Sequence, residues 1–191
     1  NDQKGIGIAN GGLGDCYYHF EKDYIRAEKH YLINLNISRN NGDKQGIMRM
    51  TSMLGSILLI NATETDKDDQ GELIKKADKY YNESLIVAKD KKDYFSIMKA
   101  LEGLFKCASI TDVFDGFERL FQMLNEYLES YKSLGETISE LEKKKIESGQ
   151  AFDDKDVKKL NELNDLSSAL PILGKSLKEL SNKTDRYNEE I

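Results

Sequence analysis

Two short segments of the chain contain residue types that could bind a nucleotide or a metal ion. The glycine-rich run Gly5–Gly12 resembles loops that cradle phosphates, but such a loop follows a β-strand, and no strand candidate precedes this one. The run Asp66–Gly71 opens like a calcium loop, yet Ala77 stands at loop position twelve, where a bidentate glutamate is needed. We therefore interpret the first segment as helix and the second as a solvated acidic stretch that could serve as a docking surface.

The two cysteines could form a disulfide or a reactive pair. Cys16 and Cys107 each lie three residues after a leucine of the repeat described below, and Ile57 holds the equivalent position between them. Cysteine, isoleucine and cysteine at equivalent positions indicate a small apolar slot in a core. We therefore predict that both cysteines are buried and unpaired.

Nothing else in the sequence supports catalysis. His19 and His30 have no partner at metal-ligand spacing, and no serine or cysteine nucleophile motif accompanies them. We predict a protein that is not an enzyme and needs no cofactor or metal.

Composition excludes further classes. The 34 acidic and 28 basic residues give a net charge of -6, which disfavours nucleic acid as a partner. No stretch approaches the ~18–20 apolar residues of a membrane span, so we expect no membrane insertion and a cytoplasmic location. The chain begins with Asn1 rather than Met, and we expect it to be part of a longer protein.

An internal repeat organises the first two thirds of the chain. Asp2 and Asp43, Gly5 and Gly46, and Leu13-Gly14 and Leu54-Gly55 are each separated by 41 residues. A third copy begins at Asp93. The pairs Ala27/Ala77, Tyr31/Tyr81 and Leu35/Leu85 recur instead at an offset of 50, which places nine extra residues in the polar stretch 61–72. We predict an all-α fold with repeat units near 1–41, 42–92 and 93–134.

Each unit is predicted to form a helical hairpin with one buried face. The first helices of the units are predicted near 6–19, 46–60 and 94–108, and the second near 24–40, 73–89 and 113–134 or beyond. Asp43 and Asp93 are predicted N-caps. Only one proline occurs in 191 residues, which agrees with long uninterrupted helices.

The last third has a seven-residue rhythm. Leucines step by three and four residues from Leu163 to Leu180, after a similar run from Tyr131 to Leu141. We predict that 135–191 form a separate antiparallel, coiled-coil-like helical hairpin, which caps the repeats or projects from them.

The pattern Leu-Gly-x-x-Tyr at Leu13–Tyr17, with Ala27 and Tyr31, resembles the tetratricopeptide repeat (TPR). The period of about 40 and the Gly-Asp-Lys-x-Gly element resemble its long subclass, as in G-protein-signalling modulator adaptors and ciliary TPR proteins. The resemblance implies an α-solenoid whose concave groove binds a peptide or helix. Carried over by repeat position, it implies a groove that also includes Ile8 and is lined chiefly by Asp15, Tyr18, Arg49, Ser52, Ser56, Lys99, Glu102 and Lys106.

The resemblance therefore implies a non-enzymatic protein–protein scaffold or adaptor in a hetero-complex, within a cytoskeletal, motor or ciliary assembly. Arg49, Lys99 and Lys106 would favour an acidic partner. The alternative is a TPR regulator of a signalling pathway that is controlled by a ligand or peptide. A third possibility is an enzyme or metal protein whose active segment lies outside this sequence.

Overall fold

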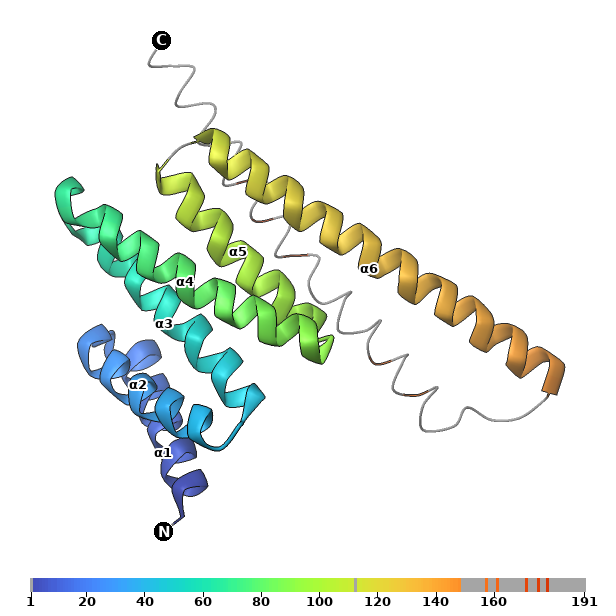
Figure 1. The fold of residues 1–191 in the computed structure, drawn as a ribbon, viewed down its shortest axis with the longest axis horizontal. Coiled ribbons are helices and arrows are strands. Elements are labelled where there is room, and N and C mark those ends of the chain that lie inside the picture. Colours follow the sequence, from blue (N-terminus) through green and yellow to red (C-terminus); the bar gives the residue numbers. More distant parts are fainter. Residues whose placement is uncertain are drawn as a thin grey trace. The chain divides into compact units, whose positions relative to one another are not determined.

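The computed structural model describes residues 2–111 and 113–148, together with Val157, Asn161, Pro171, Lys175 and Lys178. Every element within this described part is helical, which confirms the predicted all-α class (Figure 1). The described elements, in chain order, are α1 (Gln3–Cys16), a π-helical turn η1 (Tyr17–Glu21), α2 (Tyr24–Asn40), α3 (Lys44–Glu64), α4 (Lys67–Lys91), α5 (Tyr94–Thr111) and α6 (Val113–Ser148).

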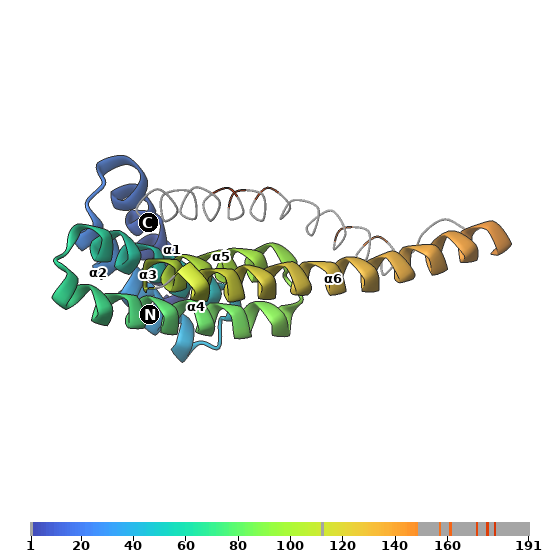
Figure 2. The same ribbon diagram turned by 90° about the horizontal axis from the view of Figure 1, so that it is seen from above.

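The chain forms two compact units, Asn1–Lys91 and Lys92–Ile191. In the first unit α1 packs on α2, α2 on α3, and α3 on α4, so neighbours in the chain are neighbours in space (Figure 1). In the second unit α5 and α6 lie side by side (Figure 2). α6 runs without interruption past residues 134 and 135. The second helix of the predicted C-terminal hairpin lies outside the described residues.

Aspartates begin the helices that the repeat pattern marks. The carboxylate of Asp43 accepts a hydrogen bond from Gly46 N at 3.1 Å, and that of Asp93 accepts one from Ser96 N at 2.9 Å. These contacts confirm both predicted N-caps, because they satisfy amides that have no partner inside the helix. Asp2 caps α1 and Asp23 caps α2 in the same way.

The core of the first unit lies between α2 and α3. Ala27, Tyr31 and Leu35 project from α2 at four-residue spacing and are at most 2% exposed. They pack against Met50, Leu54 and Ile57 of α3. The four-residue spacing predicted this buried face of α2, and its counterparts Ala77, Tyr81 and Leu85 in α4 are also buried.

A glycine–tyrosine contact closes each of the first two hairpins. A methyl carbon added to Gly14 would lie 2.4 Å from Tyr31 Cε1, and one added to Gly55 would lie 2.9 Å from Tyr81 Cε2. Each tyrosine ring therefore occupies the space beside a glycine of the preceding helix. The glycines Gly14 and Gly55 and the tyrosines Tyr31 and Tyr81, which are equivalent in the sequence repeat, therefore also make equivalent packing contacts.

Two predictions about this unit are wrong. The stretch 61–72, predicted to lie between the helices 46–60 and 73–89, is mostly helical, because α3 continues to Glu64 and α4 begins at Lys67. No proline or glycine interrupts 61–70, and Gln70 Nε2 donates to the carbonyl of Ala62 at 2.9 Å across the short turn. Cys16 is exposed rather than buried, whereas Cys107 is buried as predicted. Repeat equivalence places Cys16 on the side of α1 that corresponds to Ile57 of α3, but no described helix covers Cys16 there.

Candidate functional site

A groove of about 690 Å³ lies in the first unit between α1 and α3, with α2 as its floor. We call it the α1–α3 groove. Its walls carry few charges, and those charges are of both signs. It is lined by Asp2, Gln3, Lys4, Gly7, Ile8, Gly11, Asn34, Ile37, Ser38, Asn41, Asp43, Gln45, Gly46, Arg49 and Met50.

The floor of the groove is centred on the side-chain amide of Asn34. Asn34 is 9% exposed, and its Oδ1 accepts a hydrogen bond from Ser38 Oγ at 3.2 Å. A methyl carbon on Gly11 would lie 2.7 Å from Asn34 Nδ2, and one on Gly7 would lie 3.2 Å from Asn34 Oδ1. The two glycines therefore make room for the amide against α1. Within the described part of the chain, Asn34 Nδ2 makes no hydrogen bond, so a donor remains at the floor.

An ion pair joins the two walls further along. Arg49 of α3 pairs with Asp15 of α1, and Tyr31 Oη of α2 donates to the same carboxylate at 3.0 Å. Burial and the bond to Asp15 raise the pKa of Tyr31, so the phenol stays protonated. Arg49 and Asp15 thus neutralise each other, and the predicted attraction of Arg49 for an acidic partner would have to break this pair.

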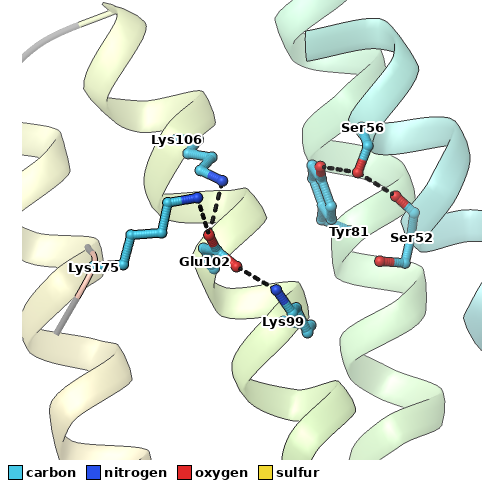
Figure 3. A network of polar contacts seen from close by, with 7 residues as sticks. All are labelled: Ser52, Ser56, Tyr81, Lys99, Glu102, Lys106 and Lys175. Atoms are coloured by element: carbon cyan, nitrogen blue, oxygen red, sulfur yellow. Dashed lines mark hydrogen bonds and ion pairs between the residues drawn. The ribbon is translucent and has the colours of Figure 1, made fainter. Parts of the chain in front are cut away.

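Tyr18 and Ser56 take part in polar contacts where α3 meets η1 and α4, and Ser52 contributes its backbone carbonyl. Burial raises the pKa of Tyr18, and the interaction with the Ser56 side chain opposes this effect without cancelling it. Ser56 Oγ lies 3.0 Å from Tyr81 Oη and 3.1 Å from the carbonyl of Ser52, as Figure 3 shows. These contacts tie α3 to η1 and α4.

The remaining predicted groove residues form a separate cluster in the second unit. Glu102 is 5% exposed, and its carboxylate lies 2.8 Å from Lys106 Nζ, 3.2 Å from Lys99 Nζ and 3.9 Å from Lys175 Nζ (Figure 3). Burial raises the pKa of Glu102, but the bonds and charges of Lys106 and Lys99 outweigh this effect and hold the pKa below its usual value. The lysines therefore stabilise a buried carboxylate.

Sequence reasoning found part of the α1–α3 groove. Of the predicted residues, Ile8 and Arg49 line it and Asp15 pairs with Arg49, while the continuity of the full predicted set across both units stays a prediction. The sequence analysis missed Asn34 and Asn41, because the repeat positions transferred from the TPR resemblance lie only in the first helix of each hairpin. The spacing of Gly7 and Gly11, one helical turn apart opposite a polar residue of α2, was the available signal.

The chemical candidates have structural explanations. Gly5–Gly12 lies inside α1, and the acidic run that resembled a calcium loop opens α4, with Ala77 fully buried. His30 Nδ1 lies 2.9 Å from Asn10 Oδ1, and its ring stacks on Tyr17 at 5.3 Å. Among the residues that the structure describes, no three His, Cys, Asp or Glu side chains are placed to hold a metal ion.

Comparisons with known proteins identify no relative. No family model, no curated protein and no solved structure matches the chain. No helix within the described ranges has both the length and the apolar character of a membrane span. A functional assignment therefore has to come from the geometry of the chain itself.

Proposed function

We propose that this chain is a non-enzymatic interaction protein that holds an extended peptide segment of a partner in the α1–α3 groove. The supporting observation is the buried side chain of Asn34, whose Nδ2 faces the groove lining without a partner among the described residues. Asn34 Nδ2 is not among the buried unpaired atoms of the described residues, so solvent reaches it in the groove. A peptide carbonyl is an acceptor that can replace that solvent.

The composition of the groove suits a peptide backbone better than a highly charged ligand. Asn41, Gln45 and Ser38 offer amide and hydroxyl groups, while Ile8 and Met50 offer apolar contact. Lys4 and Asp43 contribute opposite charges, so no strong net charge selects the ligand. We expect recognition through main-chain hydrogen bonds, with side-chain selectivity from the two apolar residues.

The wider assignment rests on the residues that resemble the tetratricopeptide repeat. On that resemblance we propose that the chain is a TPR-type scaffold within a cytoskeletal, motor or ciliary hetero-complex. The repeated N-cap aspartates and the repeated glycine–tyrosine contact support a repeat architecture.

Selection from a random peptide library on the full chain tests the groove assignment. Peptides selected on the wild-type chain should bind Asn34→Ala about tenfold more weakly, because one buried hydrogen bond is lost. Asn36→Ala is the matched control, since Asn36 is exposed on the same helix and does not line the groove. Selected peptides that bind both variants equally well would refute the assignment, as would a failure to select any peptide.

A further inference from the structure

Two asparagines lie seven residues apart on the floor of the α1–α3 groove. Asn34 lies inside α2, and Asn41 directly follows its last residue with a backbone that is still helical (φ -95°, ψ -2°). Seven residues are close to two full turns, so both side chains lie on the same face of α2. A helix rises about 1.5 Å per residue, which places the two residues about 10.5 Å apart along the floor.

Both asparagines have a free hydrogen-bond donor. Asn34 Oδ1 accepts the hydroxyl of Ser38 at 3.2 Å, which leaves Asn34 Nδ2 for a ligand. Within the described part of the chain, the Asn41 side chain makes no hydrogen bond, so its Nδ2 is free as well. The carboxylates of Asp2 and Asp43 at the same end of the groove accept the amides of the helices that they cap. The floor therefore suits a ligand that presents carbonyl oxygens.

The spacing of the two donors distinguishes between peptide conformations. In a β-strand, carbonyls that point the same way are about 6.6 Å or about 13 Å apart, and neither distance matches 10.5 Å. In an α-helix, carbonyls recur at a matching distance, but they are already bonded within the helix.

A polyproline II segment fits the spacing best. It has three residues per turn and rises about 3.1 Å per residue, so carbonyls three residues apart point the same way at about 9.3 Å. The remaining difference of about 1 Å is within the reach of two rotatable asparagine side chains. The carbonyls of this conformation have no partner inside the segment and are free to accept.

We propose that the α1–α3 groove binds a proline-rich segment in the polyproline II conformation, with Asn34 and Asn41 donating to carbonyls three residues apart. This inference rests on the proposed function and names the conformation and register of its ligand. Proline has a carbonyl but no amide hydrogen, so it loses nothing on a floor of donors. Ile37 lines the groove between the two asparagines and offers a proline ring apolar contact. The sequence contains a single proline, Pro171, so such a segment comes from outside these 191 residues.

Two nonapeptide libraries test the conformation. One has proline and the other valine at positions 1, 4 and 7, and the remaining positions are random in both. On the full chain, the proline library should yield binders about tenfold tighter than the valine library. Asn34→Ala and Asn41→Ala should each weaken these binders about tenfold. Asn36→Ala and Asn40→Ala are the matched controls, because both residues are exposed on α2 and do not line the groove. Circular dichroism establishes that the variants fold.

The outcomes separate this inference from the proposed function. Valine peptides that bind as tightly as the proline peptides, and that depend on Asn34, would overturn the polyproline II conformation but leave the groove assignment intact. Binders that are insensitive to both Asn34→Ala and Asn41→Ala would overturn both proposals, and so would a failure to obtain binders from either library.

A thioamide scan of the tightest proline peptide tests the register. Sulfur accepts a hydrogen bond more weakly than oxygen, so replacing each carbonyl oxygen in turn locates the carbonyls that the groove binds. Two replacements three residues apart should each weaken binding about fivefold. The first effect should disappear in Asn34→Ala and the second in Asn41→Ala, as expected for directly contacting groups. Any other separation of the two sensitive carbonyls would overturn the register, and so would effects that persist in both variants.

Discussion

The hairpin α1–α2 and the hairpin α3–α4 use the same packing contacts but different turns. Both place a glycine against a tyrosine ring, at Gly14–Tyr31 and at Gly55–Tyr81. Both bury an alanine four residues before that tyrosine. Equivalent contacts therefore hold each hairpin together despite the different spacing along the chain.

The turns absorb the difference in spacing. In the first hairpin, η1 places a π-helical turn at the end of α1, and α2 begins only three residues before Ala27. In the second, α3 continues as regular α-helix and α4 begins ten residues before Ala77. The shorter first hairpin is thus closed through a π-turn, and the nine extra residues of the second hairpin are accommodated by longer helices. The comparison shows that the glycine–tyrosine contact is maintained while the turn varies.

The largest expected effect comes from filling the glycine contacts. Gly14→Ala should destabilise the chain by about 1–3 kcal/mol, because the fully buried ring of Tyr31 has no space to move away from the added carbon. Gly55→Ala should cost less, because the added carbon would lie 2.9 Å from the nearest ring atom, compared with 2.4 Å at Gly14. Urea unfolding measures both variants. Gly12→Ala is the control and should stabilise α1 by up to about 1 kcal/mol. If Gly14→Ala and Gly12→Ala changed the free energy of unfolding equally, the glycine–tyrosine contact would not be what holds the first hairpin together.

Removing the tyrosine hydroxyls should have effects of similar size, and the two tyrosines should differ. Tyr31 donates to a carboxylate at 3.0 Å, whereas Tyr81 pairs with the neutral hydroxyl of Ser56 at 3.0 Å. Hydrogen bonds to charged groups contribute more, so Tyr31→Phe should cost about 1.5–3 kcal/mol and Tyr81→Phe about 0.5–1.5 kcal/mol. Thermal unfolding of the two variants tests the order, and the reverse order would contradict our assignment of the partners.

High pH should weaken the first hairpin. The pKa of Tyr31 is raised in the folded state, chiefly by burial and then by Asp15, so the folded chain keeps a proton that the unfolded chain loses. Stability is therefore complete below the unfolded tyrosine pKa of roughly 10 and falls as the pH rises above it. The Tyr31→Phe variant should show a shallower decline in melting temperature over this range. Parallel declines in wild type and variant would assign the effect to other groups.

The smallest effect is expected at the end of η1. Lys22 has a φ of 57°, a left-handed conformation that favours glycine. Lys22→Gly should therefore stabilise the chain by about 0.5–1 kcal/mol. Lys29→Gly, at an exposed position inside α2, should instead destabilise it by a similar amount. Chemical denaturation measures whether each glycine substitution raises or lowers stability. A loss of stability in Lys22→Gly would contradict the proposed backbone strain at Lys22.

Local signals predicted much of the helical framework. The prediction of 24–40 agrees with α2, because Asp23 caps its start and polar residues follow its end. The prediction for the first helix ended at 19 and missed the π-turn, since a sequence period of 3.6 does not show a local change to a wider turn. Residues 61–72 were wrongly placed between two helices because the polarity of the whole stretch was taken as the connection, whereas only Thr65 and Asp66 separate α3 from α4.

The candidate site was less predictable than the helices. Burial of Cys16 failed as a prediction because repeat equivalence gives the side of the helix but not whether another helix covers it. Asn34 was missed because its role depends on two glycines of a different helix. The ion pair between Arg49 and Asp15 depends on how α1 and α3 pack, and the local sequence around either residue does not predict that packing.

The order of helix packing has a consequence for how the chain folds. The principal contacts among the described helices join elements that follow each other in the sequence: α1 with α2, α2 with α3, α3 with α4, and α5 with α6. Short loops close quickly, and chains dominated by such contacts reach the folded state in microseconds to milliseconds. Under mechanical tension from its N-terminus, the first unit should release one helix after another, beginning with α1.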